Sequence, residues 1–318
     1  MSGEFEAISR LFQVRTPFVH PLTQIANGDD ASVHQIPHDM ELVISTDSAV
    51  SGVHWPVDMS LEIAANRAVE AALSDLAAMG AEPTWLWLAI MAKDNKSLED
   101  MSLGIVQACL KHHVELAGGD TVSSPTNIIN VTVAGLVPQG FAMTRKSAHA
   151  GDEIWLIGSL GLSALGLKQW QSGEHQGSCV QDFQYIKPQL EKGIMLRELG
   201  IQCCMDISDG LLQDASHIAQ ASQVQMCFEL NLLQTLPCYQ KLQSFTTDVQ
   251  ALSLMLNGGE DYALLCTAPT SKHQPLKELG ATQLGYCANS SNIEGCRVKL
   301  MQHGKEIVFD TKGYDHFG

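Results

Sequence analysis

Six short stretches of the sequence place a carboxylate beside glycine, serine or threonine at the edge of an apolar segment. They are NGDDAS (27–32), STDSAVSGVHW (45–55), LSDLAAMGA (73–81), AGGDTVSS (117–124), MDISDG (205–210) and NGGEDYA (257–263). Taken alone, each is compatible with an ordinary helix cap or turn, because Asp, Ser and Gly favour those positions. A more specific chemistry follows only if the fold brings several of them together.

Acids that come together in this way need cations beside them. Carboxylates about 4 Å apart repel by roughly 4 kcal/mol per pair at an effective dielectric near 20. Lys and Arg are scarce around the six stretches, so neutralising side chains are not available locally. Mg²⁺ prefers carboxylate, hydroxyl, water and phosphate oxygens, and STD at 45–47 offers two hydroxyls and a carboxylate in succession. The pattern therefore indicates a site where divalent cations bridge the protein to an anionic substrate.

Asp75 fits the capping interpretation least well. Helical periodicity extends over 60–80, and the residues three or four positions from Asp75 in such a helix are three alanines and a methionine. A carboxylate on so apolar a face is costly to bury without a partner. The alternative is that the helix restarts here and that Ser74 or Asp75 caps it.

Three acids follow an apolar run in CCMDISDGLLQDASHIA (203–219). Asp206 and Asp209, with Ser208 between them, can face one site from the end of a strand, so we expect both to bind metal there. Asp214 lies one turn into the helix that follows. There we expect a solvated acid, or one favoured by the helix dipole, with no catalytic role.

Length and composition limit the kind of protein this is. With 318 residues, of which 45% are hydrophobic and 17% charged, the chain is long enough for about two domains. A net charge of −16 argues against nucleic acid or an anionic membrane surface as partner. No apolar run approaches the roughly 20 residues of a membrane span, and no secretion signal is present at the N-terminus. The nine cysteines are scattered without a CxxC pair, which favours reduced thiols in the cytoplasm.

Strands and helices alternate along the chain, which predicts a mixed α and β fold. Runs rich in β-branched and aromatic residues predict strands at 41–46, 84–92, 127–137, 153–160, 203–207, 224–230 and 262–268. Helical periodicity occurs at 60–80, 97–114, 182–199 and 210–222. The polar stretch TRKSAHAGD (144–152) predicts a domain boundary near residue 148. QSGEHQGSC (171–179) predicts an exposed loop, and the tail from 303 to 318 a hairpin followed by an irregular terminus.

The six stretches resemble, in order and spacing, the motifs of the thiamine-monophosphate kinase family in the aminoimidazole ribonucleotide synthetase-like (PurM-like) superfamily. The likeness extends from GEFEAI (3–8) to GYDHF (313–317). It implies an α+β chain of two domains. The N-terminal domain, 1–148, binds ATP and Mg²⁺ and dimerises through a barrel-forming mixed sheet with helices, and the C-terminal α/β domain, 149–318, completes the active-site cleft. It also implies a cytoplasmic homodimer that phosphorylates thiamine monophosphate with ATP, giving thiamine diphosphate.

The same resemblance implies roles for individual residues. Those that match metal ligands are Asp30, Ser45, Thr46, Asp47, Asp75, Asp120, Asp206 and Asp209. Those that match nucleotide contacts are Gly119, Asp120, Arg145 and Ser208. Those that match residues near the thiamine moiety are His54, Glu260 and Tyr314.

The sequence departs from the family pattern at three places. The family often has an aromatic residue against adenine on the helix before GGDT; the segment 97–116 has none, and we assign that position to Leu103. Ala72 replaces the family's usual Asn, and Trp55 replaces Phe. None of these departures removes a predicted metal ligand.

Several residues also have plain structural interpretations. His54 is a candidate turn histidine, Trp55 a core residue, and Arg145 an exposed arginine whose place near the boundary favours a phosphate contact. Glu260 and Asp261 are candidates for capping a Gly-Gly turn. Tyr314 either stacks on a cationic ring or anchors the C-terminus. The Gly-rich GSLGLSALG (158–166) predicts strand-to-helix packing, with a phosphate cradle as the alternative.

The expected mechanism follows from two absences. No GxxxxGK[ST] loop occurs, so this is not a P-loop kinase. No strong general base is required either, because thiamine monophosphate already presents an ionised phosphate oxygen. The protein must instead align two anions and offset their repulsion. We therefore expect direct in-line transfer without a phosphoenzyme, assisted by clustered Mg²⁺ ions.

Two other functions compete with this one. The first is the reaction of another ATP-dependent superfamily member, aminoimidazole ribonucleotide synthetase being one candidate. Selenophosphate synthetase uses a Cys or selenocysteine near its N-terminus, whereas the first cysteine here is Cys109; the hydrogenase-maturation dehydratase ends in a reactive Cys, whereas this chain ends GYDHFG. The second is a non-catalytic nucleotide- or calcium-binding module, which tight ATP binding without turnover would support.

The apolar segment TWLWLAIMA (84–92) predicts how the N-terminal half dimerises. It carries Trp85, Trp87 and Ile90, more apolar surface than one face of a sheet usually needs. We expect this surface to lie in a homodimer interface. The alternative is burial inside the monomer.

Overall fold

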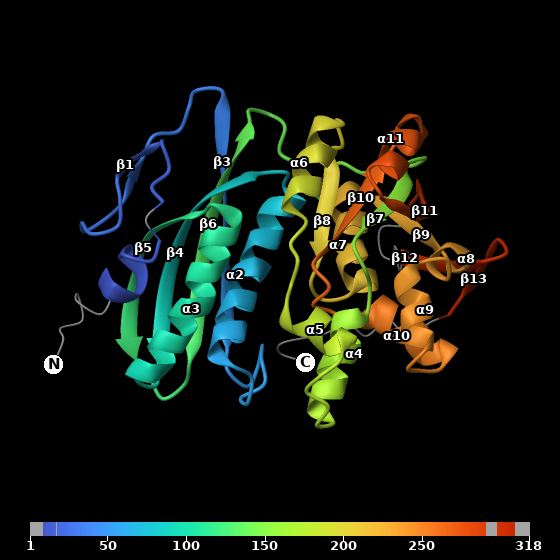
Figure 1. Ribbon diagram of the computed structural model, residues 1–318. Coiled ribbons are helices and arrows are strands. Elements are labelled where there is room, and N and C mark those ends of the chain that lie inside the picture. Colours follow the sequence, from blue (N-terminus) through green and yellow to red (C-terminus); the bar gives the residue numbers. More distant parts are fainter. Residues whose placement is uncertain (1–8, 17, 291–297, 309–318) are drawn as a thin grey trace. The chain divides into compact units, whose positions relative to one another are not determined.

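The computed structural model describes residues 9–16, 18–290 and 298–308, and the chain forms two compact units (Figure 1). Unit 1 comprises Met1–Leu76 and Ala81–Gly140, and unit 2 comprises Ala77–Gly80 and Phe141–Gly318. Each unit is built on its own sheet. The family-implied α+β architecture of two domains is therefore present.

Unit 1 contains a four-stranded sheet in the order β3-β6-β4-β5. Its strands are β3 (Met40–Val50), β4 (Glu82–Ala92), β5 (Glu115–Ser123) and β6 (Ile128–Pro138). Strands β4 and β5 are parallel, and the other neighbours are antiparallel. A parallel pair needs a crossover connection, which helix α3 (Asn95–His112) supplies. The segment η1 (Ser9–Gln13) and the pair β1 (Thr23–Ile25) and β2 (Val33–His34) precede the sheet.

Helices α2 (Leu61–Ala78) and α3 lie against one face of this sheet (Figure 1). Gly104 lets them approach closely, because a Cβ there would lie 1.9 Å from the carbonyl oxygen of Glu62. Near the end of α3, Lys111 Nζ and His112 Nε2 lie 2.7 and 2.6 Å from the carboxylate of the buried Glu70 of α2. These contacts hold α2 in place, and α2 carries Asp75.

The apolar strand β4 is largely buried within unit 1. Trp85 and Ile90 are 1% and 2% exposed. The Trp85 indole donates to Thr23 Oγ1 at 2.9 Å, and the half-buried Trp87 donates to Ser32 Oγ at 2.9 Å. Burial inside the unit, the alternative interpretation, therefore accounts for these tryptophans, and the homodimer stays a prediction that needs other support.

Unit 2 contains a seven-stranded sheet in the order β13-β12-β9-β11-β7-β10-β8. The strands are β7 (Glu153–Ile157), β8 (Cys203–Ile207), β9 (Val224–Glu229), β10 (Ala263–Ala268), β11 (Thr282–Asn289), β12 (Val298–Gln302) and β13 (Lys305–Ile307). Only the β9–β12 pair is parallel among these described strands. Every residue of β8 and β10 is buried, so this part of the sheet is covered on both faces.

Helices surround the sheet of unit 2. They are α4 (Leu162–Gln171), α5 (Ser178–Gln184), α6 (Leu190–Glu198), α7 (Leu211–Ser222), α8 (Leu230–Leu233), α9 (Pro237–Gln243), α10 (Asp248–Asn257) and α11 (His273–Glu278), with the 3₁₀ turn η2 (Thr270–Lys272) before the last. Helix α7 packs against β8 and α10. The eight cysteines among the described residues are buried and unpaired.

The predicted elements agree with the structure except at one helix. The periodicity over 182–199 predicts a single helix, but α5 ends at Gln184 and α6 begins at Leu190. Pro188 lies between them, lacks an amide hydrogen and disfavours helical backbone in the residue before it. A hairpin is present as β12–β13, but its first strand begins at Val298, before the predicted range 303–318, and residues 309–318 lie outside the described part.

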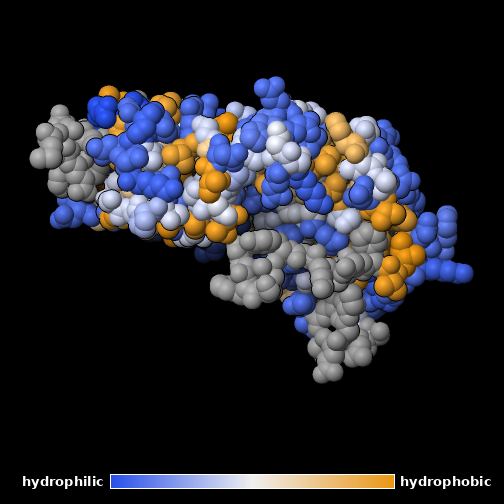
Figure 2. Space-filling model, turned by 90° about the horizontal axis from the view of Figure 1, so that it is seen from below, coloured by the Kyte–Doolittle hydropathy of each residue, from blue (hydrophilic) through white to orange (hydrophobic). Residues whose placement is uncertain are grey.

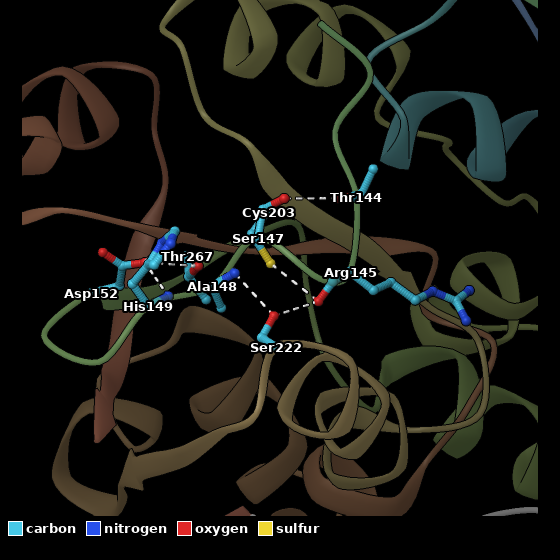
Figure 3. A network of polar contacts seen from close by, with 9 residues as sticks. All are labelled: Thr144, Arg145, Ser147, Ala148, His149, Asp152, Cys203, Ser222 and Thr267. Atoms are coloured by element: carbon cyan, nitrogen blue, oxygen red, sulfur yellow. Dashed lines mark hydrogen bonds and ion pairs between the residues drawn. The ribbon is translucent and has the colours of Figure 1, made fainter. Parts of the chain in front are cut away.

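Residues 141–148, which overlap the polar stretch 144–152 of the predicted boundary, are hydrogen-bonded to the rest of unit 2. The amide of Thr144 donates to Gln202 O at 2.8 Å. Ser222 Oγ donates to Arg145 O at 2.7 Å and accepts from the amide of Ala148 at 3.0 Å (Figure 3). These bonds explain why the chain passes between the units at residues 140–141, whereas the sequence predicts a boundary near 148.

The surface is mostly hydrophilic on the face that Figure 2 shows, with apolar residues in separate patches. The sheet face of unit 1 opposite α2 carries several exposed apolar residues. Leu42, Ile44 and Val122 are 42%, 59% and 43% exposed, and the cross-strand register places their side chains on one face. We call this surface, with Thr46, the open face. None of the described helices is both long and apolar enough to span a bilayer.

Candidate functional site

Strand β3 and helix α2 bring three of the predicted residues of unit 1 together. Ser45 and Asp47 are two positions apart on β3, so their side chains lie on the same face of the sheet. Ser45 Oγ donates to Asp75 Oδ2 at 2.5 Å. Burial first, and the Asp75 carboxylate second, raise the pKa of Asp47 to about 6. Because α2 runs without a break through Asp75, the interpretation of Asp75 as a helix cap is wrong.

Thr46 does not join this group. Its side chain alternates to the open face, where its Oγ1 lies 2.9 Å from Oγ1 of Thr132 on β6. The two hydroxyls and the carboxylate of STD therefore do not converge, because successive side chains of a strand point to opposite faces. A metal-ligand role for the Thr46 side chain stays a prediction.

The other predicted residues of unit 1 lie on more exposed backbone. Asp30 is exposed in the loop between β1 and β2, and its amide donates to Asp29 Oδ1 at 2.8 Å. Asp120 is exposed on β5 and accepts from the amide of Thr121 at 2.9 Å. Gly119 is required by packing, since a Cβ there would lie 2.4 Å from the carbonyl oxygen of Leu88. No contact in the structure joins Asp30 or Asp120 to the Ser45–Asp75 pair among the described residues.

The donor set of unit 1 fits an ion that retains other ligands. No three His, Cys, Asp or Glu side chains among the described residues come close enough to hold a metal by themselves. Ser45, Asp47 and Asp75 offer hard oxygen atoms only. Mg²⁺ usually keeps several waters and is bound by one or two carboxylates together with substrate phosphates. The residues present therefore fit Mg²⁺ and do not form a closed cage.

In unit 2, the strand order brings together three segments that are far apart in the sequence. Strand β10 lies between β7 and β8 and is antiparallel to both, with Leu264 opposite Ile157 and Ala263 opposite Ile207. The ends of β7 and β8 and the start of β10 therefore meet at one edge of the sheet. We call residues 158–163, 207–210 and 258–262 the loop junction.

Backbone hydrogen bonds tie two of these segments together. The amide of Glu260 donates to Ser208 O at 2.7 Å, and that of Tyr262 donates to Ile207 O at 2.8 Å. Both residues adopt left-handed backbone, with φ of 67° and 48°. Such backbone costs a non-glycine residue roughly 1–2 kcal/mol and is enriched at functional sites. Gly259 packs so closely that a Cβ would lie 2.4 Å from Ser208 O.

Asp261 fastens the third segment. Both of its carboxylate oxygens lie 2.9 Å from the amide nitrogen of Gly161, just before α4. Burial raises the pKa of this carboxyl well above its usual range, although the backbone donors oppose the shift. The chain's own carboxylate thus occupies the amides that a phosphate cradle at 158–166 would use. Strand-to-helix packing explains this stretch, and capping explains Asp261.

Asp214 is buried, so the expectation of a solvated acid is wrong. It is 1% exposed, and its Oδ2 accepts from the amides of Ser208, Asp209 and Gly210 at 3.0, 3.0 and 3.2 Å. Burial first, then Asp209, raises its pKa to about 7. The helical spacing in the sequence could have predicted this burial, because Asp214 shares a helix face with the apolar Leu211 and Ile218.

Asp206 and Asp209 occupy different environments. Asp206 is 5% exposed within β8, opposite Leu264. Asp209 is half-buried in the loop junction, and its Oδ2 accepts from Gln213 Nε2 at 3.3 Å. The structure thus places Ser208, Asp209 and Glu260 together at one edge of the sheet, with Asp206 one residue inside the strand.

His54 forms a turn contact, as its structural interpretation predicts. Its Nδ1 accepts from the amide of Val50 at 3.0 Å, so the neutral ring carries its proton on Nε2. Trp55 beside it is 3% exposed, which confirms that it is a core residue. Leu103, our adenine position, is 39% exposed on α3. Tyr314 lies outside the described residues.

The structure does not bring Arg145 to the loop junction. Its carbonyl oxygen lies 3.9 Å from Sγ of Cys203, the first residue of β8, whereas Ser208 follows the last. A strand of this length separates the two by roughly 16 Å. The Arg145 side chain is exposed and extends away from the network in Figure 3. Its nucleotide role stays a prediction.

Family models match most of the chain. The N-terminal domain model of AIR synthase related proteins matches residues 28–137, and the C-terminal domain model matches residues 149–288. The chain is 35% identical to the thiamine-monophosphate kinase of Escherichia coli (strain K12), covering 99% of this chain and 98% of that protein. It is 28% identical to that of Bacillus subtilis (strain 168), with 94% and 95% coverage.

Solved structures agree with these matches. A thiamine-monophosphate kinase from Stenotrophomonas maltophilia K279a is similar with a TM-score of 0.82 and 30% identity, covering 96% of this chain and 98% of that chain. AaThiL complexed with AMPPCP and TMP gives 0.74 at 24% identity, with 99% and 97% coverage. The hydrogenase maturation protein HypE in complex with ATP gives 0.77 at 20% identity, with 98% and 95% coverage. At these lower identities the last two likenesses concern the fold alone.

Proposed function

The chain belongs to the thiamine-monophosphate kinase family, built from AIR synthase related domains, and from this premise we propose that it phosphorylates thiamine monophosphate with ATP. The bond between the γ-phosphorus and the β–γ bridging oxygen breaks, and a phosphate oxygen of the acceptor forms the new bond. The products are ADP and thiamine diphosphate. We further propose that the transfer is direct and in line, and that clustered Mg²⁺ ions assist it.

The observation that carries this proposal is the group formed by Ser45, Asp47 and Asp75. These oxygen donors come from a rigid strand and a rigid helix, and the Asp75 carboxylate disfavours the charged form of Asp47 in the absence of a cation. When bound there, Mg²⁺ would supply the positive charge that offsets repulsion between two phosphate-bearing substrates. Asp30, Thr46, Asp120, Asp206 and Asp209 complete the proposed set of metal ligands.

The residues of this chain contribute mainly by positioning the substrates. Phosphoryl transfer to an ionised oxygen requires alignment and electrostatic stabilisation and no strong base. We assign nucleotide contacts to Gly119, Asp120, Arg145 and Ser208. We assign thiamine contacts to His54, Glu260 and Tyr314, and the rigid backbone of Glu260 supports its part in this assignment.

A homodimer through the open face is a further part of the proposal. Leu42, Ile44 and Val122 form an exposed apolar surface on a sheet whose other face is covered by helices. Exposed apolar surface rimmed by polar residues is typical of interaction sites. A cytoplasmic location is also proposed, since the eight described cysteines are unpaired thiols.

One experiment tests the activity directly. Purified protein is incubated with MgATP and thiamine monophosphate, and phosphorus NMR resolves the products. We expect ADP and thiamine diphosphate in equal amounts. Hydrolysis of ATP without a new diphosphate, or turnover only with another acceptor, would replace this activity with that of another superfamily member. ATP binding without any turnover would favour the non-catalytic module.

A further inference from the structure

Asp214 is bound to the backbone in a way that goes beyond an ordinary helix cap. One carboxylate oxygen accepts from three successive amides, those of Ser208, Asp209 and Gly210. Three consecutive amides that converge on one point form an anion-binding concavity. Here the chain fills that concavity from within, because Asp214 is 1% exposed on the buried face of α7.

The bonded backbone belongs to residues with proposed roles in the reaction. Ser208 is a proposed nucleotide contact and Asp209 a proposed metal ligand. Since the amide of Asp209 is itself held at 3.0 Å, the backbone from which its carboxylate projects is fixed by Asp214. The carbonyl oxygen of Ser208 in turn accepts from Glu260, so the same anchor also determines where Glu260 lies.

We propose that Asp214 is a positioning residue that sets the orientation of Asp209 and Ser208 toward metal and nucleotide without touching either. This inference rests on the proposed function of Asp209. Residues that orient metal ligands typically contribute roughly tenfold to a hundredfold in affinity or activity. A purely structural role would affect stability and leave those quantities unchanged.

Two variants distinguish the loss of the hydrogen-bond acceptor at position 214 from the loss of its negative charge. Asp214→Ala removes the acceptor and leaves three buried amides unpaired, whereas Asp214→Asn keeps an oxygen of the same reach. Mn²⁺ binding is measured by the loss of the free-ion EPR signal, with ADP present. We expect Mn²⁺ affinity to fall about tenfold or more in Asp214→Ala and to stay within about threefold of wild type in Asp214→Asn. The same ranking is expected for kcat.

Asp152 provides a matched control in the same unit. It is also a buried acid that holds a turn, since Oδ2 accepts from the amide of His149 at 2.8 Å and from Thr267 Oγ1 at 3.5 Å (Figure 3). It lies at the opposite edge of the sheet, where Glu153 pairs with Ala268. Asp152→Ala should lower the melting temperature and leave Mn²⁺ affinity unchanged.

A double-mutant cycle shows whether Asp214 acts through Asp209. In the Asp209→Ala background, Asp214→Ala should lower Mn²⁺ affinity less than it does in the wild type, because the metal ligand that it positions is absent and only its effect through Ser208 and the nucleotide is left. Additive losses, or an Asp214→Ala protein that melts earlier but binds Mn²⁺ normally, would overturn the inference while the proposed activity stands. Equal Mn²⁺ binding by wild type and Asp209→Ala would overturn the metal role of Asp209 and this inference with it. Absence of thiamine diphosphate formation by the wild type would count against the proposed function alone.

Discussion

The two units hold their candidate site residues by different means. In unit 1, Ser45 and Asp47 project from the middle of a strand and Asp75 from the body of a helix. In unit 2, Ser208, Asp209 and Glu260 lie on loop backbone that regular secondary structure does not hold. Positions on strands and helices are fixed by backbone ladders, whereas the loop junction requires anchors of its own.

The anchors of unit 2 are acids with raised pKa values. Asp214 and Asp261 each bind backbone amides from the inside of the unit, and burial raises the pKa of both. In unit 1, the acid whose pKa is raised, Asp47, is itself a proposed ligand. A carboxyl with a raised pKa is therefore a proposed ligand in one unit and a backbone support in the other. The hydrogen-bond partners of each carboxylate, and not its pKa alone, distinguish the two roles.

The largest effect is expected from removing a unit 1 acid. Asp75→Asn should lower kcat at least about a thousandfold, roughly 4 kcal/mol of transition-state stabilisation, because a charged ligand is lost from the proposed cation site. Steady-state kinetics at saturating MgATP and thiamine monophosphate measure the loss. Unchanged circular dichroism confirms folding. Near-normal turnover of Asp75→Asn at high Mg²⁺ would mean that Asp75 is not part of the site. The comparison between ligands fixed on a strand or helix and ligands on loops held by anchors would then fail.

The next effect concerns the acceptor. Free thiamine should have a kcat/KM at least about a hundredfold lower than thiamine monophosphate, a gap of roughly 2.7 kcal/mol. It lacks the phosphate that the unit 1 acids would hold through metal, and its hydroxyl would need a base. Competition kinetics with both acceptors give the ratio, and comparable turnover would contradict phosphate anchoring.

A substitution in unit 2 tests the proposed contact between Glu260 and the thiamine moiety. Glu260→Ala should lower kcat/KM for thiamine monophosphate while KM for ATP changes little. An equal loss for both substrates would show that Glu260 supports the junction backbone, as its left-handed conformation and its bond to Ser208 also allow.

The sequence predicts elements well where burial and local chemistry agree. Strand β8 has the predicted bounds because a run of buried apolar residues stops at the loop-forming SDG. Strand β5 was not predicted, since AGGD has the composition of a turn. It is a strand because Gly119 allows β4 to approach its backbone, with a Cβ position only 2.4 Å from Leu88 O.

The loop junction could not be predicted from the sequence. It depends on the order β7-β10-β8, and no local pattern gives the order of strands in a sheet. The six acidic stretches contain most of the proposed site residues, yet the sequence alone does not separate the role of Asp209 in MDISDG from that of Asp214, five residues further on. Only the contacts of Asp214 with three amides separate an anchor from a ligand.

A smaller effect is expected where the junction is most tightly packed. Gly259→Ala places a Cβ about 2.4 Å from Ser208 O, so the backbone of Glu260 must shift; we expect a loss of roughly 2–3 kcal/mol of stability and about tenfold in kcat/KM. Gly173→Ala is the control, because the added Cβ would meet nothing within 4 Å. Only the backbone φ of +91° at Gly173 disfavours an alanine there. This substitution should cost roughly 1 kcal/mol of stability and no activity. Similar results for both would mean that close packing does not position the site.

A change in stability alone, without metal, tests the charge balance of unit 1. Burial and Asp75 raise the pKa of Asp47 to about 6, above that of an unfolded aspartate near 3.9. Its contribution to stability is therefore complete below about pH 4 and is lost as the pH rises through about 6. Asp47→Asn cannot ionise, so in EDTA it should be more stable than wild type at pH 8, by roughly 3 kcal/mol.

The pH and metal dependence of this gain decides what causes it. Thermal unfolding in EDTA should show the Asp47→Asn advantage at pH 8 and none at pH 4, because wild-type Asp47 is then protonated. Added Mg²⁺ should reverse the order, since only the wild type keeps both charged ligands and binding stabilises the folded state. Asp120→Asn, at an exposed position of the same sheet, should give no such advantage at pH 8. If the stability advantage of Asp47→Asn were equal at both pH values, or persisted in Mg²⁺, the packing of the new side chain and not the loss of charge would be responsible. Unit 1 would then hold its acids without the repulsion that a cation is proposed to relieve.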